Sequence, residues 1–307
     1  MTIASTELAS AGWSARIPLV WRCKQSEKRL SITLLRLVGC IVVVSFHTIG
    51  GTSPGGAFLF AALAVALTST SGDYRGLIEN RGKRLVLPWL FWSAVYGAVK
   101  GIHVLRHGQS LSQVFPATTL LCGTSVHLWY LPYAFCGAVA TSFGMRCIRQ
   151  RWVWVAATGA LVFAATMAIG HVHTAPFGQW ILAVPALALG IVFNILRREK
   201  GSAADVAMAV GTVWVACAMA YMWGGNEIEP VFIGATLLGS LWCIRAKSFE
   251  ILDKWAELTY GVYLLHPMVL WYTHRPGWNL VPVIALTVLI CGAITAIIKN
   301  TWIKRFV

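Results

Sequence analysis

Two ionisable side chains share one otherwise uncharged apolar stretch, residues 36–47. Arg36 begins the stretch and His47 ends it. At about 100° and 1.5 Å per residue, eleven helical steps bring both side chains onto one face, roughly 16 Å apart along the axis. Arginine suits the phosphates of an anionic ligand, and histidine can act as a general base near neutral pH. The pair predicts a functional site, and the alternative is a snorkelling arginine and a core histidine.

A second cluster lies in the segment 126–132, which contains His127, Trp129 and Tyr130 and ends at Pro132. A histidine beside two aromatic side chains can bind and orient a substrate. A Trp/Tyr pair at the end of an apolar run is also typical of the aromatic belt at a membrane surface. Both interpretations stay open from the sequence alone.

A third cluster lies in the apolar run 258–274. Thr259, Tyr263 and His266 are spaced i, i+4 and i+7, so a helix places them on one face. Pro267 has no N–H to donate to the carbonyl of Tyr263, which predicts a kink of the helix beside His266. The alternative is that these polar side chains only join helices to one another.

The basic run Arg81-Gly-Lys83-Arg84 precedes the apolar run that contains Pro88. Arginine binds phosphate in a bidentate manner, so Arg81 and Arg84 are candidate contacts for an anionic ligand. Such a run also commonly marks the cytoplasmic end of a membrane helix.

The composition requires a membrane around these clusters. The chain is 57% hydrophobic and 12% charged, with a mean hydropathy of +0.68, whereas soluble domains carry about 25% charged residues. The sequence predicts an all-α integral membrane protein with about ten transmembrane helices over 31–307, after a membrane-surface tail over 1–30. The predicted spans are 33–50, 56–72, 85–104, 127–145, 152–170, 177–196, 203–223, 230–246, 258–274 and 279–299. The segment 109–125 is predicted to be a surface or re-entrant helix.

The distribution of charge predicts the orientation. With the N-terminus in the cytoplasm, 22 of the 25 lysines and arginines lie on the inner side, and only Lys100, Arg106 and Arg275 lie outside. Both termini are therefore predicted to be cytoplasmic. The net charge of +14 follows from this topology rather than from nucleic-acid binding. No carboxylate lies deep in a span, which argues against proton and cation carriers, and no spacing resembles a metal site.

Together, these four stretches resemble the acyltransferase 3 family of integral-membrane acyltransferases, over residues 30–300. The resemblance implies transfer of an acyl group, commonly acetyl from acetyl-CoA, to a hydroxyl of a surface polysaccharide or lipid-linked sugar. It also implies that His47 is the essential catalytic group. One departure is that residues 58–64 lack the Ser-Gly that usually follows the Phe-Phe pair of the family's second helix.

These observations predict an O-acyltransferase of the bacterial inner membrane. Acetyl-CoA is the expected co-substrate, held by its anionic end, and His47 acts as general base, with an acyl-histidine intermediate as the variant. No tightly bound cofactor, no metal and no nucleic acid are expected. The predicted donor contacts are Arg36, Arg81 and Arg84, and the predicted site-lining residues are His127, Trp129, Tyr130, Tyr263 and His266. The alternative is a flippase for a lipid-linked glycan, which would be expected to show internal repeats that this sequence does not show clearly.

Overall fold

A computed structural model describes residues 29–49, 55–68, 74–108, 110, 115–148, 150–172, 176–273 and 279–307. Among them, helices account for all regular structure except one isolated bridge between Arg29 and Lys247. The prediction of an all-α protein is therefore confirmed for this part of the chain. The predicted surface tail lies outside the described residues up to residue 28.

Each of the ten predicted apolar runs overlaps with a helix, although the bounds differ by several residues for some of them. These are α1 (Leu30–Ile49), α2 (Gly55–Ala66), α4 (Leu87–Arg106), α7 (Tyr130–Cys147), α8 (Arg151–Ala168), α9 (Phe177–Glu199), α10 (Ala203–Met222), α11 (Ile228–Trp242), α12 (Glu250–Thr273) and α13 (Leu280–Ile298). In the described part of the chain, six helical segments are long and apolar enough to cross a membrane: α1, the run that includes α4, α8, α9, α10 and α13. The full number of spans and the side of each terminus stay predictions.

The shorter elements connect these helices. They are α3 (Tyr74–Arg81), a π-helix (Gly82–Val86), α6 (Thr119–Cys122) and the 3₁₀ turns Val126–Trp129, Ile169–His171 and Trp302–Phe306. In the predicted surface segment 109–125, the described part contains only the single turn α6, and residues 109 and 111–114 lie outside the described residues.

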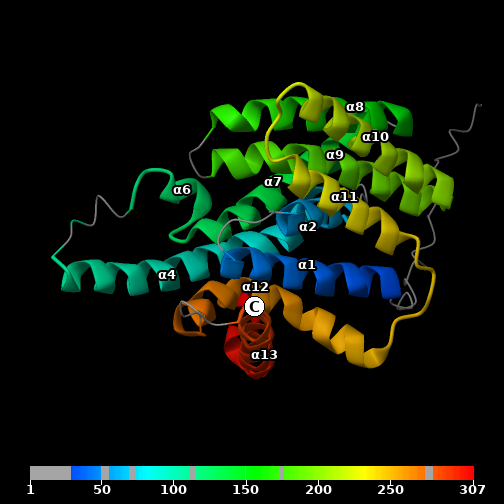
Figure 1. Ribbon diagram of the computed structural model, residues 1–307. Helices are drawn as coiled ribbons and strands as arrows, with labels where there is room; N and C mark the ends of the chain where they lie inside the picture. The colour runs from blue at the N-terminus through cyan, green and yellow to red at the C-terminus, as the bar shows by residue number, and fades with distance from the viewer. Residues whose placement is uncertain are drawn as a thin grey trace, which may run out of the picture.

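Helix α1 lies in the middle of the bundle, where it contacts α2, α11, α12 and α13. Figure 1 shows α8, α9 and α10 stacked on one side of α1 and α2, with α12 and α13 on the other. One apolar core joins α2 to α7–α11, and a second joins α1 to α4, α12 and α13. Tyr130 packs against both cores. The site residues described below therefore lie at the junction between the two halves of the bundle.

Helix α2 ends at Ala66, so the predicted run 56–72 is wrong at residues 67 and 68, and its last part, from residue 69, lies outside the described residues. Side chains of α9 bind carbonyls at the end of α2 and just beyond it. Asn194 donates to the carbonyls of Val65 and Thr68, both at 2.9 Å. Arg197 also donates to the carbonyl of Thr68. The close packing of α2 on α9 thus fixes where the chain leaves the helix.

The basic run lies inside a continuous helical segment, residues 74–106, which is longer than the predicted 85–104. Pro88 lacks the N–H that would bond to the carbonyl of Arg84, and the turn before it widens into the π-helix, where Leu87 donates to the carbonyl of Gly82. The hydroxyl of Tyr260 donates to the carbonyl of Arg84 at 3.0 Å. Because Tyr260 belongs to α12, this bond fixes the basic run against the helix that carries Tyr263 and His266.

Candidate active site

Three histidines from different parts of the chain meet at this junction. The ring centroid of His47, on α1, lies 4.9 Å from that of His266, on α12. The ring of His127, from the turn before α7, lies 5.6 Å from that of His266 on another side. His266 and His127 are buried, whereas His47 is exposed. One accessible histidine is therefore backed by two enclosed ones.

The local structure of His266 follows from Pro267. Helix α12 continues through the proline, and the carbonyl of Tyr263, which Pro267 leaves without its helical donor, lies 2.7 Å from Nδ1 of His266. A carbonyl can only accept, so Nδ1 carries the proton and Nε2 has a free lone pair. Within the described part of the chain, this buried Nε2 has no hydrogen-bond partner.

Tyrosine hydroxyls hold the elements around the histidines in place. Tyr263 donates to the carbonyl of His127, which joins α12 to the turn before α7. Tyr130 donates to the carbonyl of Phe60 at 2.9 Å, and Tyr96 donates to the carbonyl of Leu264 at 2.7 Å. Each bond links two different elements of the bundle, so the relative positions of the helices around the site are set by specific polar contacts as well as by apolar packing.

A cavity of about 90 Å³ opens beside His47. Of the predicted site residues, it is lined by His47, His127, Trp129, Tyr130 and Tyr263; the remaining lining residues are Val43, Phe46, Ala57, Phe60 and Gln179. His266 is not among the lining residues, but its ring contacts that of His47. The arrangement can therefore hold a small group against an accessible imidazole in an otherwise largely apolar enclosure.

Two residues of this region were not predicted from the sequence. Gln179 contributes the one carboxamide in the cavity wall, and its Oε1 has no hydrogen-bond partner among the described residues. Tyr96 packs edge-on against His127, with ring centroids 5.0 Å apart. Both stand in apolar runs without a motif around them, so no local signal distinguishes them from other polar residues in a span.

The predicted anion-binding residues also lie together. The charge of Arg36 interacts with that of Arg84, and the charge of Arg84 interacts with that of Arg81. Arg81 also lies within electrostatic range of Tyr130, which lines the cavity. On α1, Arg36 precedes His47 by three helical turns, or roughly 16 Å. Arg36, Arg81 and Arg84 thus form a basic patch on one side of the cavity, near the N-terminal end of α1.

Among the described residues, acidic side chains occur beside this basic patch, and none is found to interact with His47. Asp253 and Glu257, near the start of α12, interact with Arg36. Asp253 also accepts a hydrogen bond from Thr33, at 2.6 Å. No group of three or more metal-ligating side chains is found among the described residues. The absence of a metal stays a prediction.

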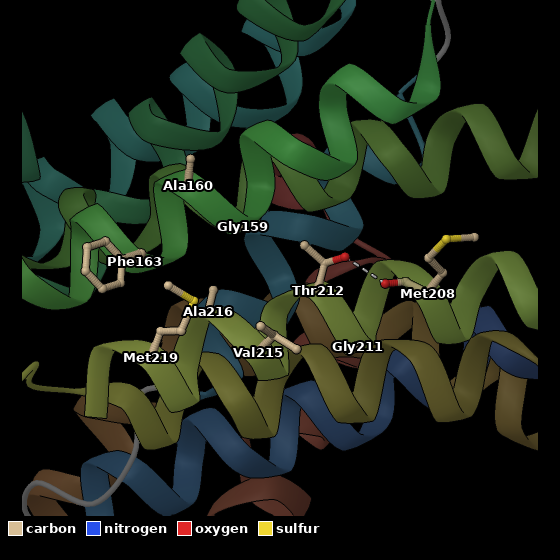
Figure 2. A pocket seen from close by; sticks show the side chains of 9 residues that line it. All are labelled: Gly159, Ala160, Phe163, Met208, Gly211, Thr212, Val215, Ala216 and Met219. Carbon is tan, nitrogen blue, oxygen red and sulfur yellow. Dashed lines mark hydrogen bonds between the residues drawn. The ribbon is translucent and has the colours of Figure 1, made fainter. Parts of the chain in front are cut away.

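Two larger grooves are lined by different kinds of side chain. Figure 2 shows a groove of about 670 Å³ between α8 and α10, whose single polar side chain, Thr212, donates to the carbonyl of Met208 in its own helix. A groove of about 530 Å³ between α4, α12 and α13 has an apolar wall. Neither is lined by a histidine, a carboxylate or a basic side chain, so of these three cavities only the smaller one has groups suited to acid–base chemistry.

A comparison with known protein families finds a match over most of the chain. Residues 29–298, most of the chain, match the acyltransferase 3 family model, described as an acyltransferase domain. Comparisons with curated proteins and with solved structures find no match. The matched range includes all of the site residues described above.

Proposed function

The chain belongs to the acyltransferase 3 family, and from this premise we propose that it transfers an acyl group, acetyl in the first instance, from acyl-CoA to a hydroxyl of a cell-surface polysaccharide or lipid-linked sugar. We place it in the bacterial inner membrane as a multi-pass enzyme. The observation that carries the proposal is that the accessible His47 lines a cavity and belongs to the same helix as Arg36, a residue of the basic patch. This combination suits a substrate with an anionic end and a reactive end.

In this proposal the nucleotide end of the donor stays at the basic patch. Arginine side chains bind phosphate through charge-assisted hydrogen bonds, so Arg36, Arg81 and Arg84 hold the diphosphate. The distance from Arg36 to His47 along α1, roughly 16 Å, is comparable with an extended pantetheine arm. The thioester then reaches the cavity while the charged end of the donor stays outside the apolar interior.

The chemical step uses the imidazole of His47. Its free nitrogen takes the proton of the acceptor hydroxyl while the oxygen attacks the thioester carbonyl carbon. When the tetrahedral intermediate collapses, the carbon–sulfur bond breaks, and the sulfur leaves with the proton that His47 had taken. The products are the O-acylated sugar and free CoA, with His47 returned to its neutral form. His127, Trp129, Tyr130 and Tyr263 shape the cavity in which the reacting groups meet.

The test uses cells that carry single variants of His47. His47→Ala and His47→Gln should both abolish acylation of the surface glycan, because neither can accept and return a proton, and general base catalysis typically contributes about 10²–10⁴ in rate. His171→Ala is the matched control, since His171 is an exposed histidine outside the cavity.

The measurements are the acetyl content of purified glycan and the total glycan yield. The proposal expects loss of acetyl groups at normal yield in both His47 variants and no change in the control. Normal acetylation in the His47→Gln cells would eliminate the base mechanism. Reduced yield with normal acetylation of the remaining glycan would instead indicate a flippase.

A further inference from the structure

We propose that His266 is the positioning residue of His47: its Nε2 accepts the ring N–H of His47 and thereby turns the other nitrogen of His47 toward the substrate. The inference rests on the proposed function, in which His47 is the base. In a catalytic triad, a carboxylate holds the catalytic imidazole in one tautomer and orientation. Here the buried His266 would have that role.

The first support is contact. The rings of His47 and His266 lie 4.9 Å apart between centroids and are inclined by 47°, which is close enough for an N–H···N hydrogen bond after a small rotation of the exposed ring. Catalytic hydrogen bonds are often loose before substrate binds. His266 is fully buried, so its own ring has no comparable freedom to turn.

The second support is the unused acceptor. The neutral ring of His266 has one N–H, and Nδ1 donates it to the carbonyl of Tyr263 at 2.7 Å. The other nitrogen, Nε2, can therefore only accept a hydrogen bond. This atom is buried and has no partner within the described residues. Leaving a buried polar atom unpaired is destabilising, and the accessible ring of His47, whose centroid lies 4.9 Å from that of His266, can supply the missing donor.

Pro267 is the device that sets this tautomer. In an uninterrupted helix, the N–H of residue 267 would bond to the carbonyl of Tyr263, and the ring of His266 would have to share that acceptor. Proline supplies no N–H, so the carbonyl is left for Nδ1 of His266. The sequence His266-Pro267 therefore presents a lone pair, rather than an N–H, toward His47.

The surroundings explain why a histidine serves here. A carboxylate buried without a charged partner is costly to desolvate, and the acidic residues of α12 closest to His266 in sequence, Asp253 and Glu257, interact with Arg36 near the other end of α1. A neutral imidazole accepts a hydrogen bond without that cost. When His47 carries the proton of the acceptor, Nε2 of His266 stabilises the resulting imidazolium and takes no proton itself.

The experiment compares three variants with wild type in inverted membrane vesicles of the host. The vesicles are supplied with radiolabelled acetyl-CoA, and the acceptors are those that the vesicles already contain. His266→Leu fills the space without an acceptor and should lower the maximal labelling rate about 10- to 100-fold, with the apparent KM for acetyl-CoA within about twofold. His266→Gln places an amide oxygen near the position of Nε2 and should recover part of the rate. Pro267→Ala should give a smaller loss, since it restores the competing N–H.

The controls separate the possible failures. Protein amount is measured by immunoblot in each preparation, and His171→Ala should behave as wild type. Equal losses in His266→Leu and His266→Gln, or a raised KM at an unchanged maximal rate, would overturn the positioning role. Wild-type activity in His266→Leu together with an inactive His47→Ala would overturn this inference alone. Wild-type vesicles that label no glycan, or an active His47→Ala, would overturn the proposed function as well.

Discussion

Gly261 offers a sharp test of whether the packing of α12 sets the geometry of the active site. It lies on α12, one turn before Leu265 and close to Tyr263 and His266. A methyl carbon built on Gly261 would lie 2.6 Å from Cγ1 of Val307 and closer still to the side chain of Thr295 on α13, whereas ordinary contact begins at 3.4 Å. Gly261→Ala should therefore force α12 and α13 apart.

The neighbours of Gly261 cannot easily give way. Thr295 is fully buried, and its hydroxyl donates to the carbonyl of Cys291 at 2.7 Å. Overpacking of this kind typically costs about 1–3 kcal/mol. A helix also gains about 0.5–1 kcal/mol when glycine is replaced by alanine. That gain is common to a matched variant, Gly211→Ala on α10, where nothing lies within 4 Å of the added carbon.

The two variants should differ by the overpacking cost alone, about 1–3 kcal/mol, with Gly261→Ala the less stable. Thermal unfolding of both proteins in the same detergent measures this order. Because a misplacement of about 1 Å can cost 10²-fold in rate, acetyl transfer should fall steeply in Gly261→Ala and stay unchanged in Gly211→Ala. Equal stability and equal activity of the two variants would refute the packing argument. Thr295→Ala in the Gly261→Ala background should recover part of the loss.

Two further predictions follow from the basic patch and from the charge distribution. Arg36→Ala should weaken the binding of acetyl-CoA by about 10- to 150-fold, because a hydrogen bond to a charged group contributes about 1.5–3 kcal/mol, and Arg36→Lys should recover it only in part; donor affinity that is unchanged in both variants would assign Arg36 to topology alone. A reporter domain that is active only in the cytoplasm should be active when it is fused to either end of the chain. A periplasmic C-terminus would contradict the predicted orientation.

Several features of the site could be predicted from the sequence because they depend on local geometry. In a membrane every backbone polar group must be satisfied within its segment, so long apolar runs become helices, and each of the ten predicted runs overlaps with one. The helical period places Arg36 and His47 on one face. The chemistry of proline likewise frees the carbonyl of Tyr263, which is where the ring of His266 is found.

Tertiary packing decided which of these faces meet. The contact between His47 and His266 joins residues of α1 and α12, and no pattern within either helix indicates which neighbour it faces. Gln179 and Tyr96 could not be predicted for the same reason. A polar side chain in an apolar run has the same local sequence whether it faces lipid, a cavity or a carbonyl of another helix. The end of α2 at Ala66 was missed because the groups that satisfy its last carbonyls, Asn194 and Arg197, come from α9. Helices and their faces are local properties of this chain, whereas its candidate active site is a product of contacts between helices far apart in the sequence.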